Sequence, residues 1–252
     1  MKLFKKEKKG NKRILHFFGI KISYKKEIKK RGLYASYGNN IINILNSKNN
    51  QIPKNLQIEI LGQNNIVEIE MPIKFKGKNL IKIVGDNNVF NLKKSIYGIE
   101  DTEFYCCDGG SILIEENVET NKGCYFVCSN DFDIKHKIVF GKDVHLARNT
   151  TVRTSDGHTI IDKTTNEPIN EPKDVIVGNH VWIGANATLL KGATLGNNSI
   201  IATCSLVNKV FKKDNVIIAG LPAKIVKENV DWDYEDFGSY KLVQKISKEK
   251  IL

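Results

Sequence analysis

The chain has 252 residues, of which 41% are hydrophobic and 27% are charged, as in an ordinary globular protein. It carries 39 Lys and Arg against 28 Asp and Glu, which gives a formal net charge of +11. This composition excludes a long disordered chain, and no apolar run approaches the roughly 18 to 20 residues that a membrane-spanning helix requires.

The positive charge is concentrated in residues 1–35, which hold 13 basic and 2 acidic residues, whereas residues 36–252 hold 26 of each. A nucleic-acid-binding domain would instead place its Lys and Arg across a folded face, so we expect no nucleic-acid partner. We interpret residues 1–35 as a basic N-terminal arm. Apolar residues between the lysines suit peripheral contact with an anionic membrane surface; they are Leu3, Phe4, Ile14, Phe17 and Phe18.

Two alternatives for this arm remain open, namely direct binding of an acidic polysaccharide and a solvated lysine-rich leader. The apolar stretch from Ile14 to Ile20 is interrupted by His16 and is followed by Lys21, without a small-residue cleavage site. It therefore does not read as a secretory signal. We expect a cytoplasmic protein, peripheral at the inner face of the membrane if the arm binds lipid.

Residues 36–130 contain two related segments, Leu61–Ile66 and Val84–Val89, which lie 23 residues apart and share a Gly-x-Asn-Asn core. Leu195–Ile200 is a third relative inside the regular repeat described below. We therefore predict that residues 36–130 form the irregular start of a β-solenoid, with Gly and Asn at its corners. A pair of hairpins with Gly-Asn turns is the alternative.

The chain has five cysteines, an odd number that suits a reducing compartment rather than a disulfide scaffold. Neither the adjacent Cys106 and Cys107 nor the pair Cys124 and Cys128 has the two-residue gap of a zinc knuckle. We expect core thiols and no metal.

Residues 131–227 carry a strict repeat of six residues, in which small or β-branched residues also recur four positions after the aliphatic one. The repeated aliphatic positions are Val177, Ile183, Leu189, Leu195, Ile201 and Val207. A period of six fits neither a helix nor a lone strand. It predicts a three-sided parallel β-coil, whose aliphatic residues point into a narrow interior and whose turns stack about 4.8 Å apart.

A loop over residues 154–173 interrupts this repeat and contains Ser155-Asp156-Gly157-His158. A loop that interrupts a strict repeat has a role other than the stacking of coils, so this loop is the first candidate for catalytic residues. After the repeat ends, residues 228–252 are charged and amphipathic, and we predict a C-terminal helical cap over the open end of the solenoid.

The segments Asp174–Gly184, Leu190–Ser199 and Ala219–Lys224 resemble the hexapeptide-repeat acyltransferases, and most closely the O-acetyltransferases that modify sugars and capsular polysaccharides. The resemblance implies an all-β fold, a left-handed parallel β-helix. It also implies a homotrimer with its active grooves between neighbouring solenoids, acetyl-CoA as acyl donor and a carbohydrate acceptor. The expected function is O-acetylation of a sugar of a surface polysaccharide or its precursor.

His158 precedes Trp182 by 24 residues, the interval between a loop histidine and the motif tryptophan in the O-acetyltransferases that this chain resembles. An imidazole can take the proton of a sugar hydroxyl near neutral pH, so we expect His158 to act as general base in a direct attack on the thioester. Asp156 could orient the imidazole, although an Asp-Gly step also simply makes a turn. The resemblance places Trp182 beside the acceptor and the cofactor thiol.

The resemblance also implies residues that line the groove or bind the cofactor. Asn130 falls about where the family has an asparagine that lines the groove from the partner subunit. Asn208 replaces the threonine usual before Lys209. The expected cofactor-binding residues are Ala185, Thr203, Asn208, Lys209, Lys224 and Lys227.

Three other functions stay open. An N-acyltransferase that acts on a nucleotide-linked amino sugar would use the same coil and cofactor, and a purely binding solenoid would leave the His158 loop without chemistry. A solenoid metalloenzyme similar to γ-carbonic anhydrase needs three histidines with two closely spaced. The four histidines of residues 131–227 contain no close pair; they are His136, His145, His158 and His180.

Overall fold

A computed structural model describes residues 39–47, 51–129 and 134–247 in full. Before residue 39 it describes the backbone of five strands, and after residue 247 it describes the backbone of helical residues 248–249. The side chains of the expected basic arm therefore lie outside the described residues, as does Asn130.

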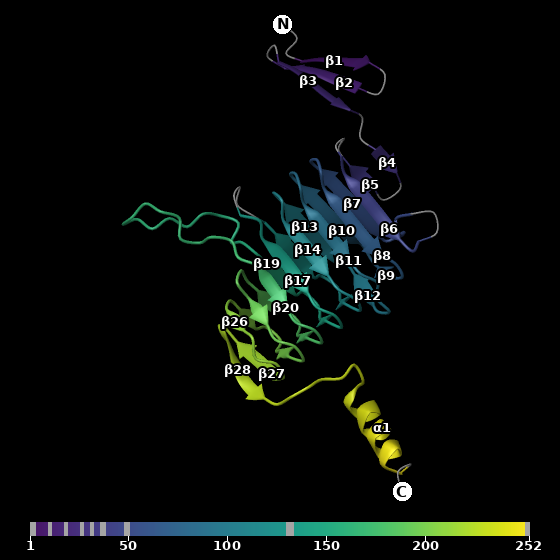
Figure 1. Ribbon diagram of the computed structural model, residues 1–252, viewed down its shortest axis with the longest axis vertical. Coiled ribbons are helices and arrows are strands. Elements are labelled where there is room, and N and C mark those ends of the chain that lie inside the picture. Colours follow the sequence, from purple (N-terminus) through teal and green to yellow (C-terminus); the bar gives the residue numbers. More distant parts are fainter. Residues whose placement is uncertain are drawn as a thin grey trace.

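The chain winds into a β-solenoid with three parallel faces (Figure 1). The first face consists of β4 (Ile28–Lys30), β5 (Leu33–Ala35), β7 (Leu56–Leu61), β10 (Asn79–Val84), β13 (Glu103–Cys107), β16 (Tyr125–Cys128), β19 (Thr151–Arg153), β22 (Thr188–Leu189) and β25 (Leu206–Val207). The second face consists of β6 (Ile41–Leu45), β8 (Ile66–Glu70), β11 (Val89–Leu92), β14 (Ser111–Ile114), β17 (Lys137–Phe140), β20 (Val175–Val177), β23 (Thr194–Leu195) and β26 (Val210–Phe211). The third face consists of β9 (Lys74–Lys76), β12 (Gly98–Glu100), β15 (Glu119–Thr120), β18 (His145–Leu146), β21 (Trp182–Ile183), β24 (Ile200–Ile201), β27 (Val216–Gly220) and β28 (Ala223–Glu228).

The interior is filled by the residues that the repeat predicted. All six aliphatic positions from Val177 to Val207 are buried, with at most 2% of their surface exposed. In the earlier coils the same interior holds a stack of aromatic rings at centroid distances of 4.8 to 5.3 Å; they are Phe90, Phe104, Phe126 and Phe140. The prediction of a parallel β-solenoid is therefore confirmed.

The corners use the left-handed backbone conformation that the Gly and Asn pattern predicted. Asn64, Asn87 and Asn198 have φ angles of 56°, 61° and 52°, a region that asparagine tolerates better than most residues. Because β7 and β10 pair in parallel, and β8 and β11 do likewise, the segments at Leu61–Ile66 and Val84–Val89 form the same corner on two successive turns. The alternative of two β-hairpins is thus wrong.

The early coils are larger than the late ones. Ile81 lies opposite Phe104, so that turn takes 23 residues, whereas Leu189 lies opposite Val207 and that turn takes 18. The additional residues lengthen the strands and widen the interior, which then accommodates the aromatic stack. This difference explains why residues 36–130 appeared irregular beside the hexapeptide region.

The two ends of the solenoid differ. At the N-terminal end, β4 and β5 extend the first face, while β1 (Phe4–Lys9), β2 (Lys12–Phe17) and β3 (Ile20–Lys25) form a separate antiparallel sheet. At the other end, β28 folds back and pairs antiparallel with β27. We expected a helix that covers the last coil. The helix α1 (Phe237–Glu249) instead leads away from the solenoid (Figure 1). No helix in the described part of the chain is long and apolar enough to span a membrane.

Candidate active site

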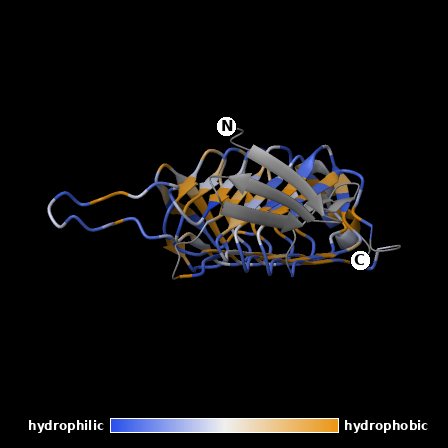
Figure 2. Cartoon of the chain, turned by 90° about the horizontal axis from the view of Figure 1, so that it is seen from above, coloured by the Kyte–Doolittle hydropathy of each residue, from blue (hydrophilic) through white to orange (hydrophobic). Residues whose placement is uncertain are grey.

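The loop over residues 154–173 connects β19 to β20, at the edge where the first face meets the second. Figure 2 shows it projecting well clear of the sheets. The loop closes on itself through an antiparallel bridge between Ile161 and Pro168 and a hydrogen bond from the Ile169 amide to the Ile160 carbonyl, 2.9 Å. The loop of residues 154–173 is therefore held together by its own backbone pairing.

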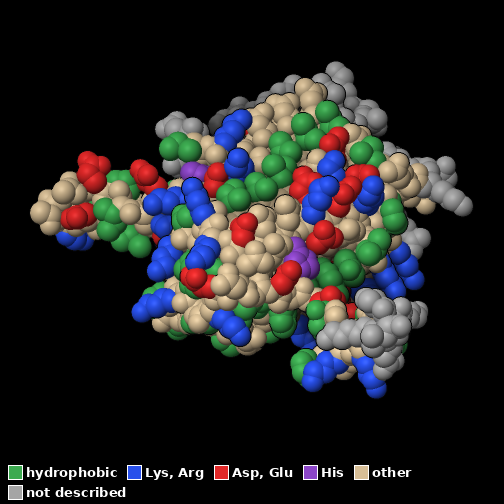
Figure 3. Space-filling view, turned by 60° about the horizontal axis from the view of Figure 1, so that its bottom comes forward, with side chains coloured by type: hydrophobic (Ala, Val, Ile, Leu, Met, Phe, Trp, Pro, Cys, Tyr) green, Lys and Arg blue, Asp and Glu red, His purple; other side chains and the backbone are tan. Residues whose placement is uncertain are grey.

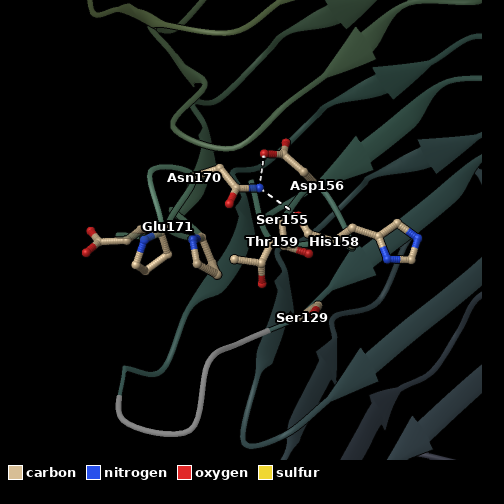
Figure 4. A pocket seen from close by; sticks show the side chains of 10 residues that line it. Ser129, Ser155, Asp156, His158, Thr159, Asn170 and Glu171 are labelled. Carbon is tan, nitrogen blue, oxygen red and sulfur yellow. Dashed lines mark hydrogen bonds between the residues drawn. The ribbon is translucent and has the colours of Figure 1, made fainter. Parts of the chain in front are cut away.

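His158 lies where this arm leaves the solenoid, in a cavity of about 420 Å³ that Ser129, Asp156 and Asn170 also line (Figure 4). Its side chain is exposed, and the described residues place no hydrogen-bond partner on its ring. In Figure 4 the imidazole points away from the carboxylate of Asp156. The ring nitrogens are thus accessible to a substrate.

The Asp156 carboxylate accepts hydrogen bonds from Lys191 Nζ at 2.5 Å and from Asn170 Nδ2 at 2.9 Å. Lys191 and Asn170 together hold the pKa of this carboxyl below its ordinary value. The same Asn170 amide donates to the His158 carbonyl at 2.8 Å. Asp156 therefore fixes the backbone of the loop, and the contact with the imidazole that the sequence allowed is not present in the described residues.

Trp182 lies on the third face and is 41% exposed, so it presents an indole to solvent. It stands beside His145 in the parallel register of β18 and β21. The imidazole of His145 is bonded through Nδ1 to Glu119 Oε2 at 2.7 Å. Two cavities of about 670 and 230 Å³ adjoin Trp182.

Residues 229–236, which we name the strap, run back along the edge between the second and third faces and wall these cavities. Trp232 stacks on His180 with centroids 4.4 Å apart, and its Nε1 donates to the His180 carbonyl at 2.9 Å. Tyr234 stacks on Tyr97 at 4.6 Å. The sequence analysis did not predict this aromatic cluster. Residues 228–252 are mostly charged, and their sequence contains no signal that an aromatic residue there packs against a coil far upstream.

The structure does not bring His158 and Trp182 into one cavity within a chain. His158 lies at the edge of the first and second faces, Trp182 lies on the third face next to the strap, and the second face separates them. Asn130 is outside the described residues, but its neighbour Ser129 lines the His158 cavity. His158 and Trp182 of a single chain therefore lie on either side of its second face.

The expected cofactor-binding residues border the last coils. Ala185 and Thr203 lie on successive turns of the edge between the third and first faces, where the Cys204 amide bonds the Ala185 carbonyl at 2.9 Å. Asn208 and Lys209 follow β25, at the same edge as His158. Lys224 and Lys227 lie on β28 with exposed side chains. These residues thus flank the C-terminal part of the first face, and their contact with a cofactor remains a prediction.

The cysteines are distributed as buried and exposed thiols. Cys106, Cys107, Cys124 and Cys128 are buried, and burial raises the pKa of Cys107 and of Cys124 to about 11. Cys204 is exposed. Over the described ranges, no group of three or more His, Cys, Asp or Glu is arranged to hold a metal ion.

Comparison with known proteins gives three concordant findings. Residues 174–209 match the family model for the bacterial transferase hexapeptide of six repeats. A polysialic acid O-acetyltransferase of Neisseria meningitidis is 34% identical over 200 residues, which is 79% of this chain and 89% of that protein.

The fold is also similar to two solved structures. The polySia-specific acetyltransferase NeuO superposes with a TM-score of 0.70 at 26% identity, over 85% of this chain and all of that one. The polysialic acid O-acetyltransferase OatWY superposes with a TM-score of 0.59 at 29% identity, over 80% of this chain and 90% of that one.

Proposed function

Because the chain belongs to the hexapeptide-repeat acyltransferases and is an O-acetyltransferase with their left-handed β-helix, we propose that it moves an acetyl group from acetyl-CoA to a hydroxyl of a surface polysaccharide or its precursor. The relatives named for polysialic acid support a polysaccharide acceptor. The single observation that carries the chemistry is an exposed imidazole, His158, on a loop that an ion pair fixes to the solenoid.

His158 acts as general base. Its unprotonated ring nitrogen takes the proton of the acceptor hydroxyl as the oxygen attacks the thioester carbonyl, and the imidazolium then returns that proton to the departing sulfur. Acetyl-CoA, when bound, supplies the activated acetyl carbonyl. The products are an acetyl ester and a free thiol, so no covalent enzyme intermediate is required and the imidazole ends the cycle as it began.

The cofactor-binding residues follow from their positions. Small side chains at Ala185 and Thr203 leave the edge between the third and first faces open for an extended pantetheine arm. Lys209, Lys224 and Lys227 provide ammonium groups for the phosphates. Asn208 lies at the edge that carries His158, which suits a contact near the thioester end.

The complete site forms between copies in a homotrimer. A cyclic assembly with the second face toward its axis sets the His158 edge of one copy beside the Trp182 edge of the next. The outer surface of the second face supports this arrangement with a column of mostly apolar residues in direct register; they are Leu113, Val139, Ile176, Thr194 and Val210. Each site then joins His158 of one copy to Trp182 of its neighbour.

The enzyme works in the cytoplasm, where acetyl-CoA and polysaccharide precursors meet. The charge of residues 1–35 holds it at the anionic inner face of the membrane. The neutral remainder of the chain carries out the reaction.

The test uses two inactive variants, His158→Ala and Trp182→Ala, co-expressed with different tags and purified through both. Each variant alone is expected to fold and assemble but to release no coenzyme A with a hydroxyl glycan. Mixed trimers are expected to recover about one third of the wild-type sites, because a ring that contains both variants has one interface in three where an intact His158 meets an intact Trp182.

Thr164→Ala, at the exposed tip of the same loop, is the matched control and is expected to retain activity. Turnover by His158→Ala alone would contradict the assignment of the base, and mixed assemblies without activity would contradict the shared site. Transfer to amino sugars only would replace the proposal with N-acylation.

A further inference from the structure

Helix α1 presents apolar side chains that nothing within the described chain covers. Tyr240, Leu242, Val243 and Ile246 are between 43 and 58% exposed. An isolated helix of about 12 to 15 residues is marginal in water, so most of its stability must come from packing. The exposed apolar side of α1 therefore indicates a surface that another molecule covers.

The strap determines where along the solenoid this helix begins. The Val230 amide bonds the Asn215 carbonyl at 3.1 Å, and Trp232 and Tyr234 are each stacked on a ring of the solenoid. The first turn of α1 then lines the 670 Å³ cavity beside Trp182, through Phe237 and Tyr240. The helix thus starts at the level of the coil that carries Trp182.

The loop of residues 154–173 belongs to the same coil, because β19, the loop, β20 and β21 follow one another directly in the chain. It too presents uncovered apolar side chains, since Ile160, Ile161 and Ile169 are 49 to 62% exposed. Figure 1 shows the loop and α1 leaving the solenoid on opposite sides. A rotation about an axis parallel to the solenoid preserves height, so the loop of one copy is brought to the helix of the next.

The charges of the two elements are complementary. Residues 156–172 of the loop carry four acidic side chains and one lysine, whereas α1 up to Ser247 carries two lysines and no acidic residue. Figure 3 shows acidic side chains gathered on the projecting loop. Such a pairing favours association of unlike elements over association of two helices or two loops.

We propose that α1 docks on the His158 loop of a neighbouring copy, with Leu242, Val243 and Ile246 packed against the three loop isoleucines. This inference rests on the shared site proposed above. The docked helix holds the loop so that its His158 faces Trp182 of the chain that donates the helix. Helix α1 is then a positioning element for the general base.

Contact between copies can be measured without any assay of activity. Ile169→Cys and Val243→Cys are introduced together in a Cys204→Ser chain, whose remaining thiols are buried. Mild oxidation is expected to link chains into dimers and closed trimers on a non-reducing gel. The matched control moves the helix cysteine to Lys241, on the opposite side of α1, and is expected to link at least about tenfold more slowly.

Activity provides the second measurement. Val243→Asp with Ile246→Asp is expected to lower kcat on the order of tenfold, because a loosened loop misplaces the base, while KM for acetyl-CoA stays unchanged. Gln244→Asp adds one negative charge outside the side of the helix formed by Leu242, Val243 and Ile246, and is expected to leave kcat unaltered. Equal kcat in all three proteins would overturn the positioning role.

The outcomes separate this inference from the proposed function. Mixed assemblies that recover activity without any cysteine linkage between copies would overturn the docking and leave the function standing. Linked trimers of an enzyme that transfers no acetyl group would overturn the function and leave the docking standing.

Discussion

At the scale of single residues, the structure separates two roles that the sequence joined in one motif. Asp156 and His158 are two residues apart, yet the carboxylate faces Lys191 and Asn170 while the imidazole faces the open cavity. Lys191 belongs to the following turn of the solenoid, so the ion pair ties the loop to the coil below it. The carboxylate thus acts on the backbone that carries the base.

Because Asp156 holds the loop backbone and not the imidazole, we predict similar effects for Asp156→Asn and Lys191→Met. Each is expected to lower kcat several-fold by loosening the loop, and the double variant is expected to lose no more than either single one. Lys191 lowers the pKa of Asp156, so this carboxylate is ionised near neutral pH and takes up a proton only as the pH falls through the lowered pKa, below about 3.9. The acidic limb of kcat/KM near neutral pH is therefore expected to stay in place.

Lys163→Met, which removes a lysine from the tip of the same loop, is the control and is expected to leave kcat unaltered. A pH–rate profile of each variant is the measurement. An acidic limb that moves in Asp156→Asn and stays in Lys191→Met would contradict this account, because it would show that the carboxylate acts on the imidazole. The free energy of unfolding should change by less than about 1 kcal/mol, as for other exposed ion pairs.

At the scale of elements, the corners explain which parts of the fold the sequence could predict. A period of six predicted the coil from Val177 to Val207, whose aliphatic positions are buried. It did not predict every corner, because the left-handed residues stand three positions after the aliphatic ones and include His180 and Cys204. The spacing of His158 and Trp182 gave both residues of the site that we propose, and their roles stay a prediction. A helix within residues 228–252 was predicted and is present as α1. The positions of the strap and of α1 were not predictable, because they depend on stacking between residues more than 50 apart, such as His180 and Trp232.

The corner at Cys204 departs from the Gly and Asn pattern, and this departure yields a prediction. Cys204 has a φ angle of 59° at the position where the two preceding coils have Asn149 and Asn186, whose side chains are bonded at 3.1 Å. Cys204→Asn is expected to raise the free energy of unfolding by about 0.5 to 1 kcal/mol, because asparagine adopts this backbone region at lower cost and extends the ladder. Denaturant unfolding measures the change.

Cys204→Val is the matched contrast. A β-branched residue in the left-handed region is strained, so this variant is expected to be less stable than the wild type. If both substitutions lowered the stability equally, the thiol rather than the backbone would determine the choice of residue at this corner.

At the scale of the whole molecule, the net positive charge and the proposed catalytic residues lie in different parts of the chain. The residues of the proposed site and the helix that we propose to position them all lie in residues 129–249, whereas the net charge of +11 equals the excess carried by residues 1–35. The strands β4 and β5 attach this basic segment to the end of the first face that is remote from His158. We therefore propose that the basic segment affects where the enzyme resides and leaves the proposed catalytic residues untouched.

Deletion of residues 1–35 is accordingly expected to abolish binding to vesicles that contain phosphatidylserine and to leave kcat for a soluble acceptor unchanged. Each basic residue near an anionic surface contributes about 1 kcal/mol, and the remaining chain is neutral, so the deletion removes the whole attraction. Vesicle sedimentation at low and high salt measures it, with uncharged phosphatidylcholine vesicles as the control. Binding that survives the deletion would discard the membrane role. A fall in transfer to an acidic glycan without lipid would instead assign the segment to the acceptor, because only a direct contact between lysine and polysaccharide acts in free solution.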